Sequence, residues 1–302
     1  MKEPCFFCGV DGGGTRTTVI CRMPDGQEIG SRTFGPFNLN SIGEQAFRSI
    51  LGDILAYINS LGICEGLCIG ASGITNDNER SVADGILSGT GIPYLLLGDY
   101  EIAHTGALDG KEGMILIAGT GSVCYGRTSD GRSAMGGGWG HLLGDPGSGY
   151  ALGRDALVAV SEVLDGYGEP TALQEMLSEE FGLNTPQKIV TYVYSNDKSA
   201  VASLSPLVDR ACRQGDPVAC RIVEDNARGL ADLVLAVAGR LGLGKTHVAL
   251  LGGLLENPTS LKEAFTGILA SRNAGLNCTA PLHSAAEGAL MEAIRFPFPS
   301  LL

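Results

Sequence analysis

Apolar and polar positions in the first part of the chain predict short strands separated by helices. Two apolar runs, Phe6–Val10 and Thr17–Arg22, predict a hairpin, and the sequence PDGQ supplies the next turn. Apolar residues then recur at helical spacing as far as Gly62, which ends the helix, and Ser41 and Glu44 have the spacing of a capping box. The segments GLCIGASG and IPYLLLGD predict buried strands, and each is followed by a helical pattern.

The rest of the chain begins with a second strand–turn–strand pattern, GMILIAGTGSVCYGRTSDGR, and then becomes mostly helical. Asp216 and Pro217 predict the start of a long helix, because an acid suits the N-cap and proline suits the first helical position. The segment THVALLGGLL predicts a strand that runs into a Gly-Gly turn, with a helix after Pro258 and a last helix in SAAEGALMEAI. Residues 150–194 carry no recognisable motif.

The two strand–turn–strand patterns resemble each other. Ten positions separate Thr15 from Asp25, and ten separate Thr120 from Asp130, with a glycine before each threonine and after each aspartate. Two such copies predict a duplication into two similar domains, which we place at residues 1–112 and 113–302. The alternative is a chance similarity of two glycine-rich hairpins.

Composition narrows the possible partners. The chain has 302 residues, 44% of them hydrophobic, and a net charge of −12 that makes nucleic acid and anionic membranes poor partners. No segment is long enough to cross a bilayer. The nine scattered cysteines, without an export signal, indicate reduced thiols in the cytoplasm. Cys5 and Cys8 form a CxxC pair, but they point to opposite faces of a strand, so we expect no zinc site.

Two glycine-rich turns are the first candidates for chemistry. Such turns leave backbone amides unshielded, and these amides could surround phosphate oxygens together with the Thr15 and Thr120 hydroxyls. Asp11, beside the first turn, is suited to hold Mg²⁺, because this ion keeps several waters and takes one or two carboxylates. The alternative is two tight hairpins without a ligand. The candidate phosphate-binding glycines are Gly12, Gly13, Gly14, Gly119 and Gly121.

A third glycine-rich segment, Gly239 to Thr246, matches the letters of a P-loop, GxxxxGK[ST]. A P-loop follows a strand and opens a helix, so that helix amides meet the phosphate. Here a long helix runs into the motif and a strand follows it. We therefore expect a helix end and a turn in this place.

The segment GGGWGHLLGDPGSGYALG contains the only tryptophan of the chain, Trp139. An indole among glycines could stack on a sugar, and His141 is more simply a structural residue than a base. Asp145 could contact a ligand or cap the helix that follows it. Asp99 follows a buried strand and precedes a helix, so it could be a general base at the carboxyl end of the strand, an N-cap, or both.

The motifs VDGGGTRTT, LGDYEIAHTGAL, LIAGTGS, GGGWGHLLGDPGSGYALG and LLGGLL occur in this order along essentially the whole chain. Together they resemble the BadF/BadG/BcrA/BcrD ATPase family of the actin–hexokinase–Hsp70 superfamily, which includes N-acetylglucosamine kinases. The resemblance implies an α/β fold of two ribonuclease-H-like (actin-like ATPase) domains, with a cleft between them that closes over ATP and an amino sugar.

The resemblance also implies roles for individual residues. Asp99 would take the proton from a sugar hydroxyl, and Thr15 and Thr120 would contact the ATP phosphates. The sugar would be contacted by Asn38, Gly138, Trp139, Gly140 and Asp145. Ala202, Gly252 and Gly253 would lie on the nucleotide side.

The predicted function is phosphoryl transfer from Mg²⁺-ATP to the 6-hydroxyl of N-acetylglucosamine, in a cytoplasmic protein that we expect to be a homodimer. Alternatives are a glucosamine or N-acetylmuramic acid kinase, or an ATPase that activates a redox enzyme. The redox activators of the family hold an iron–sulfur cluster through cysteines in the block where this chain has Trp139 and His141. None of the nine cysteines here lies between Gly126 and Gly149. The related glucosamine kinases lack the WGHLLG form, which favours an N-acetylated sugar. A zinc-binding cysteine cluster, as in ROK kinases, and a helix-turn-helix before Cys5, as in a sugar sensor, are also absent from the sequence.

Overall fold

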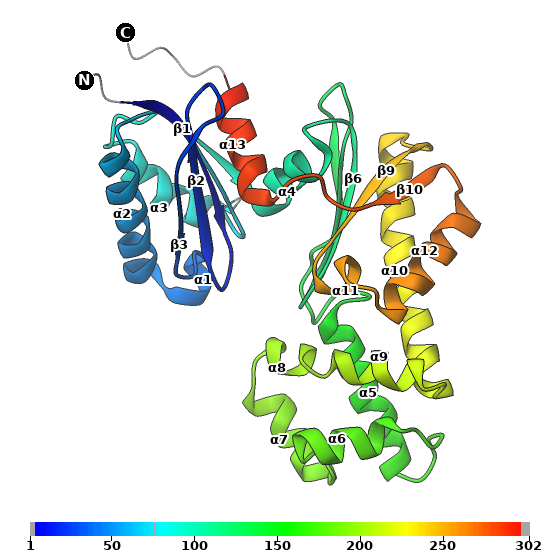
Figure 1. The fold of residues 1–302 in the computed structure, drawn as a ribbon. Coiled ribbons are helices and arrows are strands. Elements are labelled where there is room, and N and C mark those ends of the chain that lie inside the picture. Colours follow the sequence, from blue (N-terminus) through cyan, green and yellow to red (C-terminus); the bar gives the residue numbers. More distant parts are fainter. Residues whose placement is uncertain (1–3, 75, 297–302) are drawn as a thin grey trace. The chain divides into compact units, whose positions relative to one another are not determined.

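The chain divides into two compact units in a computed structural model that describes residues 4–74 and 76–296 (Figure 1). Unit 1 holds the described residues up to Lys111 and from Pro281 onward, and unit 2 is Glu112–Ala280. Each unit is built around one five-stranded sheet. This architecture confirms the predicted α/β class with a repeated domain type.

Unit 1 has a sheet in the order β3-β2-β1-β4-β5. Its first three strands pair antiparallel, and β4 and β5 add in parallel to β1. Helices α2 and α3 cover one face, and α4 and α13 cover the other (Figure 1). The elements are β1 (Cys5–Gly12), β2 (Thr17–Arg22), β3 (Glu28–Phe34), α1 (Leu39–Ile42), α2 (Glu44–Leu61), β4 (Ile63–Ala71), α3 (Asp77–Leu87), β5 (Tyr94–Gly98), α4 (Asp99–Leu108) and α13 (Ala285–Arg295).

Unit 2 has a sheet in the order β10-β9-β6-β7-β8, with the same pattern of two antiparallel and two parallel pairings. A helical insertion, α5 to α9, separates the hairpin strands from the long helix α10. The elements are β6 (Gly113–Ala118), β7 (Ser122–Arg127), β8 (Ser133–Gly137), α5 (Gly149–Leu164), α6 (Leu173–Phe181), α7 (Pro186–Ser195), α8 (Lys198–Ala202), α9 (Ser205–Arg213), α10 (Pro217–Leu241), β9 (Thr246–Leu251), α11 (Gly253–Glu256), α12 (Ser260–Arg272) and β10 (Leu276–Thr279).

The internal repeat is confirmed at the level of strands. Strand β2 begins at Thr17 and β7 at Ser122, which is the 105-residue offset seen between Thr15 and Thr120. Thr17 pairs with Gly12 in the first hairpin, and Ser122 pairs with Ala118 in the second. The second turn is therefore one residue shorter than the first.

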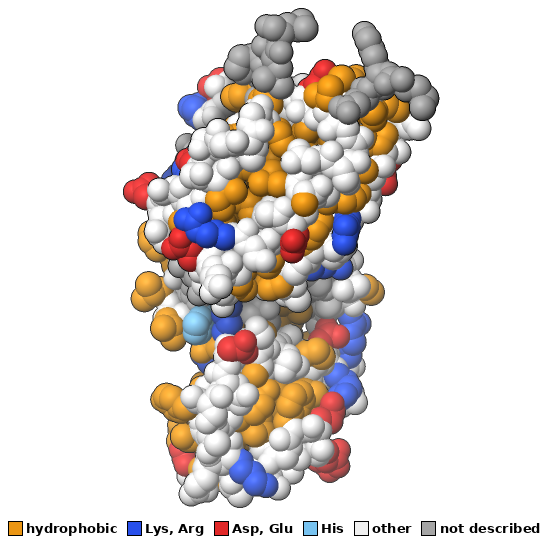
Figure 2. Space-filling model, turned by 90° about the vertical axis from the view of Figure 1, so that its left-hand side faces the viewer, with side chains coloured by type: hydrophobic (Ala, Val, Ile, Leu, Met, Phe, Trp, Pro, Cys, Tyr) orange, Lys and Arg blue, Asp and Glu red, His pale blue; other side chains and the backbone are white. Residues whose placement is uncertain are grey.

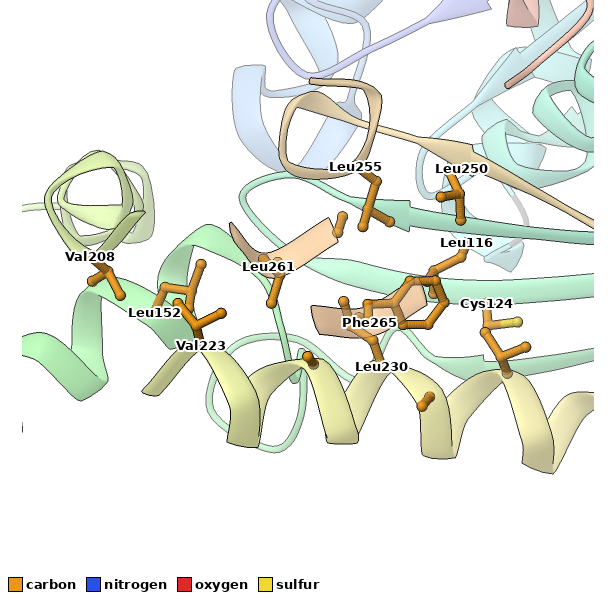
Figure 3. Close-up of a cluster of buried hydrophobic side chains, with 14 of the residues drawn as sticks. Leu116, Cys124, Leu152, Val208, Val223, Leu230, Leu250, Leu255, Leu261 and Phe265 are labelled. Atoms are coloured by element: carbon orange, nitrogen blue, oxygen red, sulfur yellow. The ribbon is translucent and has the colours of Figure 1, made fainter. Parts of the chain in front are cut away.

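The apolar stripe of α10 organises the core of unit 2. Figure 3 shows Val223 and Leu230 of this helix among side chains from the insertion, the sheet strands and α12. Phe265 of α12 is completely buried in this cluster. Leu116 of the sheet and Leu152 of the insertion thus share one core, which makes the sheet and the helical insertion one packed body.

The last helix lies in unit 1, whereas the predicted boundary places the chain from residue 281 onward in the second domain. Helix α13 packs on β1 and α4 of unit 1. A Cβ at Gly288 would lie 2.0 Å from the carbonyl oxygen of Ile102, so the glycine permits contact between the α13 and α4 backbones. Arg22 also donates to Glu287 at 3.1 Å. The prediction assumed that a domain is continuous in sequence. The small residues of α13 instead pack against unit 1.

Local helix signals had mixed outcomes. Asp216 caps α10 by accepting the Ala219 amide at 2.8 Å, as predicted. The capping box proposed for α2 is wrong, because Gly43 is the N-cap of that helix and makes no side-chain cap. Ser41 instead belongs to the short helix α1.

The charged side chains on the surface bear on which partners the protein could bind. On the face in Figure 2, acidic and basic side chains are interspersed, and no broad basic field is visible among the residues drawn in colour. Within residues 4–74 and 76–296, none of the helices has the length and apolar character required to cross a bilayer.

Candidate functional site

Three strand ends gather the candidate acids of unit 1 at one sheet edge. Asp11 lies opposite Gly70 of β4, and Ala71 lies opposite Gly98 of β5. The parallel strands β1, β4 and β5 therefore finish together, and Asp99 follows directly after the last of them. Open α/β sheets hold ligands at this edge.

Asp11 and Asp99 interact electrostatically at this edge. Burial and the nearby charge of Asp99 raise the pKa of Asp11 to about 6, and Arg16 offsets only part of this rise. Burial also raises the pKa of Asp99. Hydrogen bonds from the Tyr100 amide and from its own amide to the carboxylate lower this pKa and offset part of the rise. The two carboxylates thus raise the cost of holding two negative charges at this edge.

Asp99 is the first residue of α4 and not its N-cap, which is Gly98. Its carboxylate accepts the Tyr100 amide at 2.9 Å. The cap function belongs to Glu101, whose side chain accepts the Gly98 amide at 2.7 Å. The N-cap alternative for Asp99 is therefore wrong, and the helix amides hold its carboxylate at the edge of the sheet.

Asn38 lies near the same edge through a hydrogen bond to the β4 terminus. Its Nδ2 donates to the Ser72 carbonyl oxygen at 3.1 Å, and its Oδ1 accepts the Ser41 amide at 3.1 Å as the cap of α1. Among the hydrogen bonds between described residues, Nδ2 has this one acceptor, so its second hydrogen could meet a ligand. Sequence reasoning missed Ser72, although its place directly after a parallel strand is the same signal that singled out Asp99.

The three glycines of the first turn differ in why a side chain is absent at each position. A Cβ on Gly12 would lie 2.7 Å from the Phe37 ring, and one on Gly13 would lie 2.9 Å from the Arg16 carbonyl oxygen. A Cβ on Gly14 would meet nothing within 4 Å. Packing and turn closure thus explain the first two. Gly14 and the exposed Thr15 are the part of the turn that is free for a ligand.

The second turn, Gly119–Gly121, is braced by the start of α5. The Gly119 amide donates to the Gly121 carbonyl at 3.0 Å, and the Gly149 amide donates to the Gly119 carbonyl at 2.7 Å. The Tyr150 amide reaches the Thr120 carbonyl at 3.3 Å. A Cβ on Gly119 would again meet nothing within 4 Å. Each turn therefore has one unobstructed glycine directly before its threonine.

The nucleotide-side candidates lie against this second turn. A Cβ on Gly149 would be 3.3 Å from both the Ala202 Cβ and the Gly119 carbonyl oxygen, which places Ala202 beside the turn. Gly252 has φ = +88°, and its Cβ would be 2.4 Å from the Ala118 carbonyl oxygen. Gly253 follows as the first residue of α11. The sequence prediction overlooked Gly149, which joins these parts.

Asp145 is buried beside the second turn and does not cap α5. Its side chain is 4% exposed, and its Oδ2 lies 2.9 Å from where a Cβ on Gly121 would be. The cap of α5 is Ser148. Asn226 of α10 accepts the Gly147 amide at 2.9 Å and so holds the segment after Asp145. Asn226 was also missed, although a polar residue within an apolar helical stripe is a usable signal.

Trp139 lies on an exposed loop after β8. The indole is 75% exposed, which excludes a place in the core. Its neighbours Gly138 and Gly140 have φ values of +73° and +82°, a backbone region that favours glycine. His141 packs edge-on against the Tyr150 ring, with centroids 4.6 Å apart, in line with the structural role expected for it.

The P-loop look-alike is a helix end, as predicted. Helix α10 continues to Leu241, and Gly242 caps it with φ = +73°. Strand β9 then begins at Thr246. Lys245 thus lies in a turn that no helix follows.

The donor set in unit 1 suits Mg²⁺. Among the described residues, no group of three or more His, Cys, Asp or Glu side chains could hold a metal. Mg²⁺ needs less, because one or two carboxylates and its own waters complete its shell. A cation at Asp11 would also compensate the repulsion from Asp99 that raises the pKa of Asp11.

Comparison with known proteins gives consistent matches over almost the whole chain. The BadF/BadG/BcrA/BcrD ATPase family matches residues 8–293. An N-acetylmuramic acid/N-acetylglucosamine kinase of Clostridium acetobutylicum is 33% identical over 87% of this chain and 90% of its own length. An N-acetyl-D-glucosamine kinase of Dictyostelium discoideum is 30% identical, with 85% and 88% covered. A crystal structure from Chromobacterium violaceum, provisionally named an N-acetylglucosamine kinase, has a TM-score of 0.74 at 26% identity and covers 96% of this chain and 99% of its own.

Proposed function

Because this chain belongs to the BadF/BadG/BcrA/BcrD ATPase family, we propose that it is an ATP-dependent kinase of an N-acetylated amino sugar. The γ-phosphoryl group of ATP is transferred to the 6-hydroxyl of N-acetylglucosamine. One observation carries the proposal: Asp11 and Asp99 interact at a single sheet edge, which supplies both a cation ligand and a base.

Asp99 acts as the general base. Its carboxylate accepts the proton of the sugar hydroxyl while the oxygen forms its bond to phosphorus and ADP departs. Amide hydrogen bonds at the start of α4 fix the carboxylate, so little reorganisation is needed during the transfer. Asp11 would hold Mg²⁺, which would neutralise charge on the phosphate oxygens when bound.

The remaining residues bind and orient the two substrates. Amides and hydroxyls of Gly14–Thr15 and of Gly119–Thr120 contact phosphate oxygens. Ala202 and Gly252, which lie beside the second turn, contact the nucleoside. On the sugar, Asn38 donates from Nδ2, Asp145 accepts from a hydroxyl, and the exposed Trp139 covers a sugar face.

The choice of an N-acetylated sugar rests on the names of the two relatives, both of which include N-acetylglucosamine. The name of the bacterial relative also includes N-acetylmuramic acid, so that sugar is the second candidate. Glucosamine is a third. A homodimeric, cytoplasmic enzyme remains part of the proposal.

A coupled assay of ADP release tests the proposal. N-acetylglucosamine, N-acetylmuramic acid, glucosamine and glucose are compared with a reaction without sugar, at fixed Mg²⁺-ATP. We expect kcat/KM to be highest for an N-acetylated sugar and the product to carry phosphate on the 6-oxygen by NMR. ATP hydrolysis that is equal with and without sugar would exclude a sugar kinase and favour an ATPase activator of a redox enzyme.

A further inference from the structure

Two thiols in unit 2 are in direct contact where α9 ends and α10 begins. The Sγ atoms of Cys212 and Cys220 lie 2.7 Å apart. Backbone hydrogen bonds close the turn between them, from the Gly215 amide to the Cys212 carbonyl and from the Cys220 amide to the Asp216 carbonyl. The turn thus holds the two free thiols in contact.

Both thiols can be reached from solvent. Cys212 and Cys220 are half-buried, and they line an open pocket of about 550 Å³ together with Val223, Ser260 and Ala264. Arg213 flanks this pocket and is held by Asp209 at 3.0 Å. A small molecule can therefore meet the sulfurs without unfolding of the helices.

A second cysteine pair provides a contrast inside the same chain. Cys8 and Cys21 lie opposite each other on β1 and β2, with their Sγ atoms 3.3 Å apart. Both are completely buried in the core of unit 1. Burial also raises the pKa of the Cys8 thiol well above its usual range, so its reactive thiolate is scarce. The sulfurs of this pair are in contact, but a small molecule in solvent cannot reach them.

We propose that Cys212 and Cys220 form a reversible dithiol–disulfide modification site, oxidised by a small-molecule disulfide that enters the pocket. A thiolate of the pair attacks one sulfur of R–S–S–R, forms a mixed disulfide and releases one RS⁻. The second cysteine thiolate attacks the protein sulfur of the mixed disulfide, closes the Cys212–Cys220 bond and releases the second RS⁻. Two electrons pass from the cysteines to the small molecule, and the two thiol protons end on the released thiols or in solvent.

Burial and the contact with Cys220 raise the pKa of Cys212 to about 11, so a Cys212 thiolate forms only as its proton is released during the exchange. The second attack follows without large movement, because the sulfurs already touch. The Cys212–Cys220 disulfide links the end of α9 to the start of α10. We expect it to stabilise unit 2 because it restricts the unfolded chain.

The test uses the full-length protein and oxidised glutathione as the probe. After incubation and alkylation of free thiols, trypsin releases Cys212 and Cys220 on separate peptides, residues 211–213 and 214–221, because Arg213 lies between them. We expect these two peptides to be joined by a disulfide that dithiothreitol removes. The peptides that contain Cys8 and Cys21 serve as the internal control. Their thiols should stay free of a disulfide and should be alkylated only when the protein is unfolded.

Melting temperature gives the second readout. Oxidation should raise the Tm of the wild-type protein by about 2–6 °C. The variants Cys212→Ser and Cys220→Ser should show no such rise under the same treatment. Stable glutathione adducts without the linked peptides, or equal linkage of Cys8 to Cys21, would overturn the proposal, since either result removes the advantage assigned to this pair.

Discussion

The two sheet edges of this protein share a backbone plan but differ in charge. Asp11 of β1 faces Thr18 of β2, one pair inward from the first turn. The corresponding pair in unit 2 is Ile117 and Val123. The same register position therefore carries a carboxylate in one unit and an isoleucine in the other.

The ends of the outer strands differ in the same way. In unit 1, β5 leads directly into α4, whose first residue is Asp99. In unit 2, β10 ends at Thr279, and from Pro281 onward the chain belongs to unit 1. Unit 2 has no helix with an acid after this strand. Both units thus have an amide-rich turn, but the acids at the strand ends, Asp11 and Asp99, belong to unit 1.

The largest effect in this comparison is expected for Asp99→Asn. Asparagine keeps the size and can still accept the Tyr100 amide, but it cannot take a proton from the sugar hydroxyl. We expect kcat to fall by about 10²- to 10⁴-fold, with KM for ATP and the melting temperature close to wild type.

Asp77→Asn is the matched control, because Asp77 is also the first residue of a helix after a parallel strand, α3, but is exposed. Its kcat should remain within about twofold of wild type. Survival of kcat in Asp99→Asn together with lower stability would assign Asp99 a structural role, and Asp145 would then be the next base to test.

A smaller but selective effect is expected for Trp139→Ala. Loss of an indole that covers a sugar face should raise KM for the sugar about tenfold to a hundredfold, while KM for ATP changes little. Tyr194→Ala removes another exposed aromatic side chain, 84% exposed on α7, and should change neither constant. Equal increases in both KM values for Trp139→Ala would contradict the sugar contact.

The strands of this fold could be predicted from the sequence because their signals are local. The alternating run of β2, the DG turns and the proline at the start of α10 each act within a few residues. The partner of α13 could not be predicted in this way, since it depends on how closely Gly288 approaches Ile102 in three dimensions. The capping error at Ser41 has a similar origin, because Asn38 offers a competing cap three residues earlier.

The charge difference between the edges also predicts a pH-dependent stability. Folding raises the pKa of Asp11 from its usual value near 3.8 to about 6, so the folded state binds more protons between these values. Stability without Mg²⁺ therefore falls as pH rises from about 4 to 6 and then levels off. Asp11→Asn should remove the part of this loss that Asp11 causes and exceed the wild-type stability at pH 8 by about 1–3 kcal/mol, with no advantage below pH 4.

Thermal melts at pH 4, 6 and 8, with and without Mg²⁺, check this prediction. The variant should also lose any stabilisation that Mg²⁺ gives to the wild-type protein. Asp53→Asn, an exposed acid on α2, is the control and should follow the wild-type curve. A variant that is less stable than wild type at pH 8 would show that Asp11 has a partner that offsets its burial.

The site was predictable where a motif marks the backbone and less so where side chains meet. Asp11, Asp99 and the two turns are marked by their places at strand ends. Ser72 and Gly149 could not be found in this way, because their roles depend on contacts with Asn38 and Gly119 that only the folded chain defines. Asp145 was ambiguous for the same reason, because any acid before a helix resembles a cap.

The smallest effect is expected at the P-loop look-alike, and it separates the true turn from the false one. Lys245→Ala should leave KM for ATP within about threefold, because the lysine lies in the exposed turn between α10 and β9 and no helix amides follow it.

Gly119→Ala and Gly244→Ala form a matched pair, since a Cβ at either position meets nothing within 4 Å and both chains should fold. Only at Gly119 would the methyl group occupy space next to phosphate, so KM for ATP should rise about tenfold there and remain unchanged for Gly244→Ala. The opposite result, with loss of ATP binding in Lys245→Ala or Gly244→Ala and none in Gly119→Ala, would move the phosphate site to the end of α10.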